Sequence, residues 1–128
     1  MKDGKHLVLY VDDDPDLLEV TCLRLEQAGY ATATAGSAEE GLKVFRASEP
    51  DFIMVDLMME EIDAGTHLVK ELKLAGNRAP VYMLSSLGDQ LDASIDHHEL
   101  GLEGVFQKPL NFDLLLSTLK AKLQGAAG

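Results

Sequence analysis

The amino-acid sequence predicts an α/β protein with one doubly wound, five-stranded parallel sheet that carries helices on both faces. Short apolar runs alternate five times with longer segments of helical periodicity, which is typical of consecutive strand–helix units. Most of these runs are apolar at nearly every position, as in strands that are buried on both faces of a sheet. The length of 128 residues suits a single domain. We therefore expect one domain over residues 1–128, with its core at about 5–123 and a tail or linker remnant at 124–128.

The five apolar runs are the expected strands. They cover residues 7–11, 30–35, 52–55, 81–84 and 105–107. The second run alternates alanine with threonine, and the others are rich in aliphatic and aromatic residues, as strands commonly are. Because the strands of a parallel sheet all end at one edge, the residues that follow these runs are expected to lie together.

Capping signals mark where the intervening helices begin and end. Asp14 is a suitable N-cap with Pro15 at the first helical position, and Gly29 ends that helix. Ser37 and Glu40 have the spacing of a capping box, which predicts the start of the second helix. Three further helices are expected at about 66–75, 89–100 and 112–123.

Charge and cysteine content exclude several classes of function. The chain carries 22 acidic and 11 basic side chains, a formal charge of −11. This excess argues against direct nucleic-acid binding and against docking on a membrane of anionic lipid, but it is compatible with a basic partner or a bound metal cation. Cys22 is the single cysteine, so neither an intramolecular disulfide nor a thiolate metal cage can form. No apolar run has the length of a signal sequence or a membrane span, and we expect a cytoplasmic protein.

Polar residues follow four of the five expected strands. The first strand is followed by Asp12 and Asp13, the third by Asp56, the fourth by Ser85 and the fifth by Lys108. Clustered carboxylates repel one another by roughly 1–4 kcal/mol for each close pair. A hard divalent cation such as Mg²⁺, which prefers oxygen ligands, removes that cost. The sequence therefore predicts a magnesium site at this edge of the sheet.

The same residue types suit phosphoryl transfer. A carboxylate oxygen can attack phosphorus to form an aspartyl phosphate, and such transfer depends mainly on charge neutralisation and in-line positioning. Lys108 can neutralise a phosphoryl oxygen as a point charge, and Ser85 can donate a hydrogen bond to another.

These motifs, in this order, resemble those of bacterial response-regulator receiver domains of the chemotaxis-regulator type, the receivers of two-component signal transduction systems. The resemblance extends from about residue 5 to 123 and is carried by four segments, namely LVLYVDDDP, DFIMVDLMM, PVYMLSS and KP. It implies a flavodoxin-like (βα)5 fold, a three-layer sandwich with strand order 2-1-3-4-5.

The resemblance also implies a role for each matching residue at the metal site. Asp56 corresponds to the phosphoacceptor. Asp13 corresponds to a direct Mg²⁺ ligand, and Asp12 to a residue that acts on the metal largely through water. The backbone carbonyl of Met58 corresponds to a further ligand.

The resemblance also implies two residues that respond to the phosphoryl group. Ser85 corresponds to the switch hydroxyl and Lys108 to the lysine that pairs with the phosphoryl group, and the bond between Lys108 and Pro109 is implied to be cis. The implied phosphoryl donor is a sensor histidine kinase or a phosphotransfer protein, and the implied output is a downstream protein target. Such a domain catalyses its own phosphorylation and dephosphorylation but turns over no separate substrate, so we do not expect an enzyme.

The sequence departs from the family pattern at a few positions. Glu60 and Glu61 replace a Pro-Gly pair, which predicts altered rate or partner choice, with a damaged Mg²⁺ loop as the competing interpretation. Val105 replaces an aromatic residue that swings inward on activation, and Phe106 is expected to point to the other side of the strand. Ser86 stands where a smaller alanine is common.

Three other functions remain as alternatives. A flavodoxin-type cofactor binder needs a first loop rich in Ser, Thr or Gly, whereas this loop is acidic. An aspartyl phosphohydrolase needs a second Asp two residues after the nucleophile, where this chain has Met58. A degenerate receiver would act as a phosphorylation-independent protein-interaction module, and Asp56→Asn would then leave partner binding unchanged.

Overall fold

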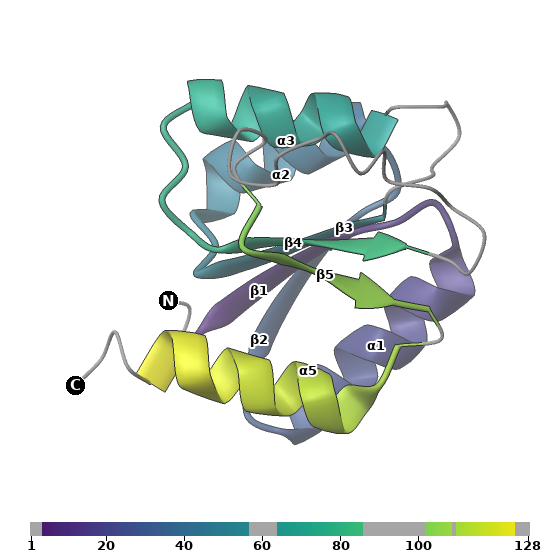
Figure 1. Ribbon diagram of the computed structural model, residues 1–128. Helices are drawn as coiled ribbons and strands as arrows, with labels where there is room; N and C mark the ends of the chain where they lie inside the picture. Colours follow the sequence, from purple (N-terminus) through teal and green to yellow (C-terminus); the bar gives the residue numbers. More distant parts are fainter. Residues whose placement is uncertain (1–3, 57–63, 86–101, 109, 125–128) are drawn as a thin grey trace.

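The computed structural model describes residues 4–56, 64–85, 102–108 and 110–124, which form a five-stranded parallel sheet with helices on both faces (Figure 1). The strand order is β2-β1-β3-β4-β5, as the family resemblance implied. The strands are β1 (Leu7–Val11), β2 (Ala31–Ala35), β3 (Phe52–Asp56), β4 (Val81–Ser85) and β5 (Gly104–Gln107). The helices are α1 (Pro15–Gln27), α2 (Ala38–Ser48), α3 (Ala64–Leu74) and α5 (Phe112–Leu119), and a π-helical turn (Lys120–Gln124) continues α5. The helix expected at 89–100 lies outside the described residues.

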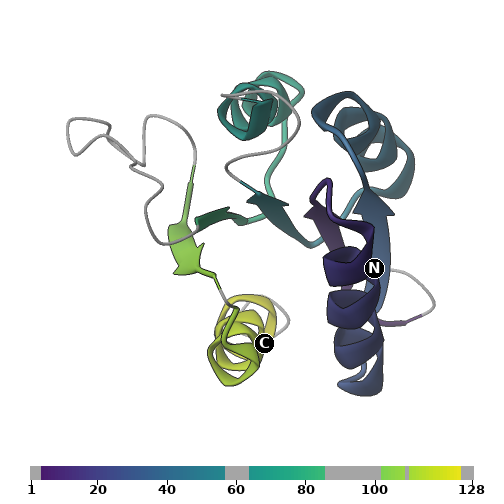
Figure 2. The same cartoon turned by 90° about the vertical axis from the view of Figure 1, so that its right-hand side faces the viewer.

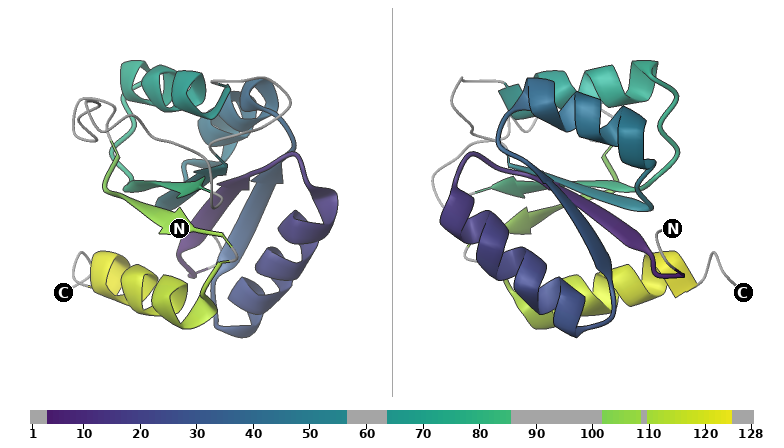
Figure 3. Two further views of the ribbon diagram at one scale, coloured as in Figure 1. Left: turned by 45° about the vertical axis from the view of Figure 1, so that its right-hand side comes forward. Right: turned by 180° about the vertical axis from the view of Figure 1, so that it is seen from behind.

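The elements form three layers. Figure 2 shows α2 and α3 on one side of the sheet and α1 and α5 on the other, and the views in Figure 3 agree. The predicted doubly wound, three-layer architecture is therefore confirmed. Among the described helices, none combines the length and the apolar character that crossing a membrane requires.

Each face of the sheet carries its own apolar cluster, because successive side chains of a strand point to opposite faces. Val8 and Tyr10 of β1 join the cluster beneath α1 and α5, whereas Leu9 and Val11 join the cluster beneath α2 and α3. All five residues of β1 are buried, as the unbroken apolar run predicted. The α1/α5-side cluster consists of Val8, Tyr10, Leu25, Phe52, Met54, Tyr82, Leu84, Phe106, Leu115, Leu119 and Leu123.

The two neighbouring residues Val105 and Phe106 of β5 also point to opposite faces of the sheet. Phe106 is buried in the α1/α5-side cluster, and Val105 packs against the cluster on the opposite face. The predicted opposite orientation of these two side chains is confirmed. Phe106 stacks on Tyr82, with ring centroids 4.9 Å apart, and Tyr82 stacks on Phe52 at 5.1 Å. Gly104 makes room for this stack, because a Cβ atom there would lie 2.8 Å from a ring carbon of Tyr82.

The predicted capping signals act at the helix starts. The Asp14 side chain accepts hydrogen bonds from the backbone N–H groups of Asp16 and Leu17 at 3.0 and 3.2 Å. The Ser37 hydroxyl accepts from the N–H of Glu40 at 3.1 Å. The Glu40 carboxylate accepts from the N–H of Gly36, one residue before the donor of a standard capping box.

A few boundaries differ from the predictions. β2 begins at Ala31 and not at residue 30, because the N–H of Tyr30 still donates to the carbonyl of Leu25 in the turn that ends α1. Gly29 has a φ of 99° and supplies the left-handed conformation that this turn needs. The helix expected at 66–75 begins earlier, at Ala64, and the last helix changes to π-helical geometry at Lys120.

Candidate functional site

The register of the sheet brings the predicted site residues to one edge. Val11 pairs with Val55, so Asp12 and Asp56 lie at the ends of neighbouring strands. The backbone N–H of Asp12 donates to the carbonyl of Ala35 at 3.0 Å, which extends the ladder to β2 and holds this residue in place. Two strands that are far apart in sequence thus deliver two carboxylates to the same place.

The other two strand ends meet beside them. Ser85 is the last residue of β4 and pairs with Gln107 of β5. The backbone N–H of Lys108 donates to the carbonyl of Ser85 at 2.8 Å, so the lysine leaves β5 next to the end of β4. Ser85 is 3% exposed and belongs to the few buried polar residues of the described chain.

Three carboxylates form a tight cluster at this edge. The carboxylate oxygens of Asp12, Asp13 and Asp56 all lie within 4.8 Å of one another. Asp12 is fully buried and Asp56 is 4% exposed, whereas Asp13 is exposed. Burying a charge is costly unless it is paired and hydrogen-bonded, so the partners of the two buried carboxylates decide whether the cluster can exist.

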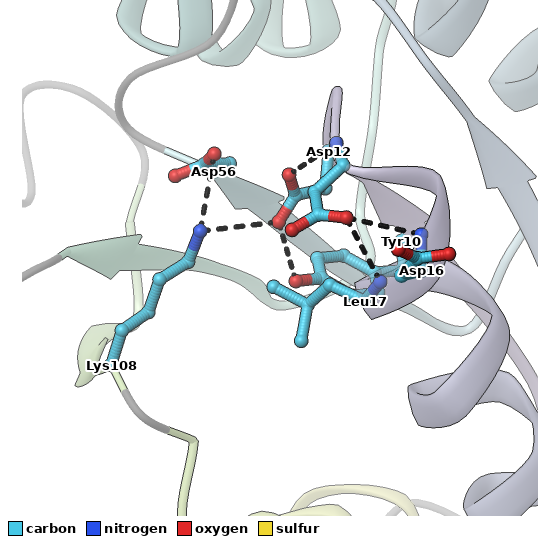
Figure 4. Close-up of polar contacts among 7 residues, drawn as sticks. Tyr10, Asp12, Asp16, Leu17, Asp56 and Lys108 are labelled. Atoms are coloured by element: carbon cyan, nitrogen blue, oxygen red, sulfur yellow. Dashed lines mark hydrogen bonds and ion pairs between the residues drawn. The ribbon is translucent and has the colours of Figure 1, made fainter.

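Lys108 pairs with both buried carboxylates. Its Nζ atom lies 3.3 Å from Oδ2 of Asp12 and 3.2 Å from Oδ2 of Asp56 (Figure 4). Burial by itself would lower the pKa of this lysine, but the attraction of Asp12 and Asp56 outweighs that effect and raises the pKa above its ordinary value of 10.5. The lysine therefore stays an ammonium ion at neutral pH.

Asp12 has partners for both of its oxygens. Oδ1 accepts from the backbone N–H of Asp14 at 3.0 Å. Oδ2 accepts from Lys108 and also from the hydroxyl of Tyr10 at 2.6 Å. Burial, followed by the hydrogen bond and the charge of Asp12, raises the pKa of Tyr10 far above its ordinary value of 10.0, so the hydroxyl stays protonated and acts as a hydrogen-bond donor.

Sequence reasoning missed Tyr10, which it treated only as part of an apolar strand. A signal was present, because residues 10 and 12 have the same parity on a strand and their side chains point to the same face. A tyrosine two residues before a buried aspartate can therefore supply a hydroxyl to that carboxylate.

The cluster has the donor set and the charge that suit Mg²⁺. Three carboxylates and one ammonium group leave a formal charge of −2, which one divalent cation balances. Carboxylate oxygens are the ligands that this ion prefers in proteins, usually one or two of them together with water. The residues present therefore fit the predicted metal.

Several predicted features lie outside the described residues. They are the carbonyl of Met58, the side chains of Glu60, Glu61 and Ser86, and the bond that joins Lys108 to Pro109. Asp14 is described, and its side chain caps α1, as expected for a residue with only a structural role.

Comparisons with known proteins agree with this geometry. Residues 8–120 match the model of the response regulator receiver domain family. The chain is 36% identical over 122 residues to the transcriptional regulatory protein GlrR of Escherichia coli strain K12, a match that covers 95% of this chain and 27% of GlrR. It is 34% identical over 130 residues to the transcriptional regulatory protein CseB of Streptomyces coelicolor, covering 100% of this chain and 54% of CseB. The chain thus spans about a quarter to a half of the length of these relatives.

Solved structures show the same similarity. The chemotaxis protein CheY4 of Vibrio cholerae superposes with a TM-score of 0.82 at 27% identity, covering 94% of this chain and 100% of CheY4. A CheY-like response regulator receiver domain protein of Methanospirillum hungatei gives a TM-score of 0.84 at 28% identity, covering 95% and 96% of the two chains. The sequence match, the strand order and the acidic edge of the sheet lead to one conclusion: this chain belongs to the response regulator receiver domain family, the signalling domains of two-component systems.

Proposed function

We propose that this chain is a single receiver domain in which Asp56 accepts a phosphoryl group, with Mg²⁺, from a sensor histidine kinase or a phosphotransfer protein. The observation that carries the proposal is the setting of Asp56. Its carboxylate is almost fully buried, pairs with Lys108 at 3.2 Å, and lies within 4.8 Å of the carboxylate oxygens of Asp12 and Asp13. A nucleophile, a cation for the developing charge and a metal-binding pair of carboxylates thus lie together at one edge of the sheet.

The metal is assigned to particular residues by their exposure and partners. Asp13 is exposed and suits direct ligation together with Asp56. The family resemblance adds the backbone carbonyl of Met58 as a further ligand. Asp12 already accepts three hydrogen bonds from protein donors, which supports a role through water. When bound, Mg²⁺ neutralises charge on the phosphoryl oxygens and orients them.

The transfer step balances as follows. An oxygen of Asp56 forms a bond to phosphorus while the bond from phosphorus to the donor's imidazole nitrogen breaks, and that nitrogen keeps the electron pair. The product carries more negative charge than the carboxylate did, and in this proposal Lys108 and the Ser85 hydroxyl, from the ends of β5 and β4, pair with it. Hydrolysis of the same bond returns the domain to its starting state, so the domain acts as a switch and not as an enzyme with a separate substrate.

The output is proposed to be a contact with another protein. The chain's charge of −11 disfavours direct binding to nucleic acid, although the relatives GlrR and CseB are transcriptional regulators. The phosphoryl charge biases a two-state surface that includes β5 and α5, and a partner that prefers one state reads it. We place this signalling in the cytoplasm, where the kinase domains of such systems act.

The proposal is tested by intact-mass analysis after incubation with Mg²⁺ and acetyl phosphate. We expect wild type to gain the mass of one phosphoryl group only when Mg²⁺ is present, and Asp56→Asn to gain none. Asp113→Asn is the matched control, because it makes the same chemical change at an exposed position in the first turn of α5 and should be labelled like wild type.

A phosphorylation-independent interaction module is the second candidate, and it rests on Val105, which stands where the family often has an aromatic residue that swings inward on activation. If folded wild type forms no adduct with acetyl phosphate and does not bind beryllofluoride, this candidate replaces the first.

A further inference from the structure

We propose that Tyr10 is a positioning residue of the metal site, whose hydroxyl holds the Asp12 carboxylate in the orientation in which it acts on Mg²⁺ through water. The inference rests on the proposed function, because it concerns the same acidic cluster. It adds a residue that lies inside the apolar core and has no charge of its own.

The contact is short and buried. The Tyr10 hydroxyl donates to Oδ2 of Asp12 at 2.6 Å, and both residues are fully buried. Figure 4 shows that Tyr10 on β1 and Lys108, which follows β5, both contact the Asp12 carboxylate. Hydrogen bonds to a charged acceptor are shorter and about twice as strong as those between neutral groups.

The ring that carries this hydroxyl has little freedom to move. Tyr10 is fully buried in the α1/α5-side cluster, and its partner on β3, Met54, is fully buried in the same cluster. Protein interiors are packed as tightly as organic crystals, so a fully buried ring keeps its position. The hydroxyl is therefore a fixed reference point for the carboxylate.

Tyr10 and Lys108 fix Asp12 in different ways. Lys108 divides its ammonium group between Asp12 and Asp56, so its position changes whenever Asp56 changes its charge or its partners. The Tyr10 hydroxyl has Asp12 as its partner, and this contact does not depend on Asp56. Tyr10 can thus keep Asp12 oriented toward the metal while Lys108 changes partner.

The metal affinity is expected to depend on this contact. Partners that orient metal-binding groups from the outer shell typically contribute 10–100-fold to metal affinity. Removing the hydroxyl leaves Oδ2 of Asp12 with one donor fewer, so the carboxylate is held less firmly. We expect Tyr10→Phe to weaken Mg²⁺ binding by no more than about tenfold, the low end of that range, because Asp12 acts through water and because Lys108 and the N–H of Asp14 still contact it.

The experiment is a Mg²⁺ titration followed by calorimetry and by near-ultraviolet difference absorbance. The chain has three tyrosines and no tryptophan, so the difference spectrum reports directly on tyrosine hydroxyls. We expect a Mg²⁺-dependent tyrosine signal in wild type that is absent in Tyr10→Phe. Tyr82→Phe is the matched control, because it removes a hydroxyl from the same apolar cluster at a position whose charge interaction is with Lys122, and its Mg²⁺ affinity should equal that of wild type.

Three further measurements separate positioning from a general loss of structure. Urea unfolding without Mg²⁺ shows that Tyr10→Phe is folded before it is titrated. The rate of labelling by acetyl phosphate should return to the wild-type value at saturating Mg²⁺, because only the affinity has changed. In an Asp12→Asn background, Tyr10→Phe should add no further loss of affinity, since the contact on which it acts is already altered.

Equal Mg²⁺ affinity in wild type and folded Tyr10→Phe would overturn this inference and leave the proposed function standing. Wild type that binds no Mg²⁺ would overturn both, because Tyr10 would then have no metal site to organise.

Discussion

The two ends of β3 carry the same residue type in opposite settings. Asp51 precedes the strand and Asp56 ends it. Oδ2 of Asp51 accepts from the N–H of Leu7 at 2.8 Å, and the N–H of Asp51 donates back to the carbonyl of Leu7 at 2.8 Å. His6 Nδ1 lies 3.8 Å from the same carboxylate, so Asp51 meets donors and a potential cation.

Asp56 instead lies beside other carboxylates. Two other carboxylates lie within 4.8 Å, and Lys108 is shared with one of them. Asp51, whose carboxylate accepts a hydrogen bond from the backbone, stabilises the fold. Asp56 lies in a cluster of carboxylates, and a metal ion or a phosphoryl group can change the electrostatic repulsion within that cluster. The following predictions test that difference.

The largest effect on stability is expected from Lys108→Ala. This change leaves the buried carboxylates of Asp12 and Asp56 without their shared cation, and breaking such a buried pair costs about 3 kcal/mol. Urea unfolding in the absence of Mg²⁺ measures the loss. Lys122→Ala is the matched control, because its pair with Glu103 is exposed and should contribute nothing measurable. Equal losses in both variants would show that the cluster does not depend on Lys108.

Asp51→Ala is expected to lower the free energy of unfolding by about 1–2 kcal/mol, because the buried N–H of Leu7 loses its acceptor. Labelling of Asp56 by acetyl phosphate should be unchanged, because residue 51 lies at the opposite edge of the sheet. Thermal unfolding and intact-mass analysis of the same sample check both statements. A loss of labelling without a loss of stability would contradict the structural role of Asp51.

Asp56→Asn should raise the free energy of unfolding, whereas the two preceding variants lower it. It removes one member of the like-charged cluster, and without Mg²⁺ we expect a gain of about 1 kcal/mol in the free energy of unfolding. Adding Mg²⁺ should stabilise wild type more than the variant, because binding to the folded state alone adds stability and the variant binds the ion less well. The idea of stored repulsion fails if Asp56→Asn is less stable than wild type in metal-free buffer.

The smallest effect is expected at alkaline pH. Burial lowers the pKa of Lys108, but the combined effect of Asp12 and Asp56 outweighs it and raises the pKa in the folded state, so the folded protein holds this proton more tightly than the unfolded chain. The resulting stability is fully present below the unfolded pKa of 10.5 and is lost as the pH rises through the higher folded value. Tyr10, whose pKa is also raised, acts in the same direction above pH 10.0.

Lys108→Arg isolates the lysine's part of this dependence, because arginine keeps its charge throughout this range. The free energy of unfolding should therefore fall less steeply with pH for Lys108→Arg than for wild type. It is measured between about pH 9 and 11.5, about one unit either side of the ordinary pKa values of tyrosine and lysine. Parallel curves would refute the assignment to Lys108.

Much of the fold could be predicted because its signals are local. Asp14 and Ser37 cap the helices that their spacing predicted, and the unbroken apolar run of residues 7–11 forms a fully buried strand. The α/β alternation requires only the period of the hydrophobic pattern, which each segment carries by itself. The exact ends of helices and strands were less predictable. The start of β2, for example, depends on a hydrogen bond from the N–H of Tyr30 to the carbonyl of Leu25, which forms only in the folded turn.

The residue types of the site were determined by the sequence alone, because every strand of a parallel sheet ends at one edge and the four polar positions are strand ends. How these groups are partnered depends on the tertiary structure. Lys108 reaches Asp12 across 96 residues of sequence, and its division between two carboxylates follows from the strand order. The contact from Tyr10 to Asp12 also depends on the tertiary structure. Packing of the core buries the Tyr10 ring, and a buried hydroxyl needs an acceptor, which Asp12 supplies.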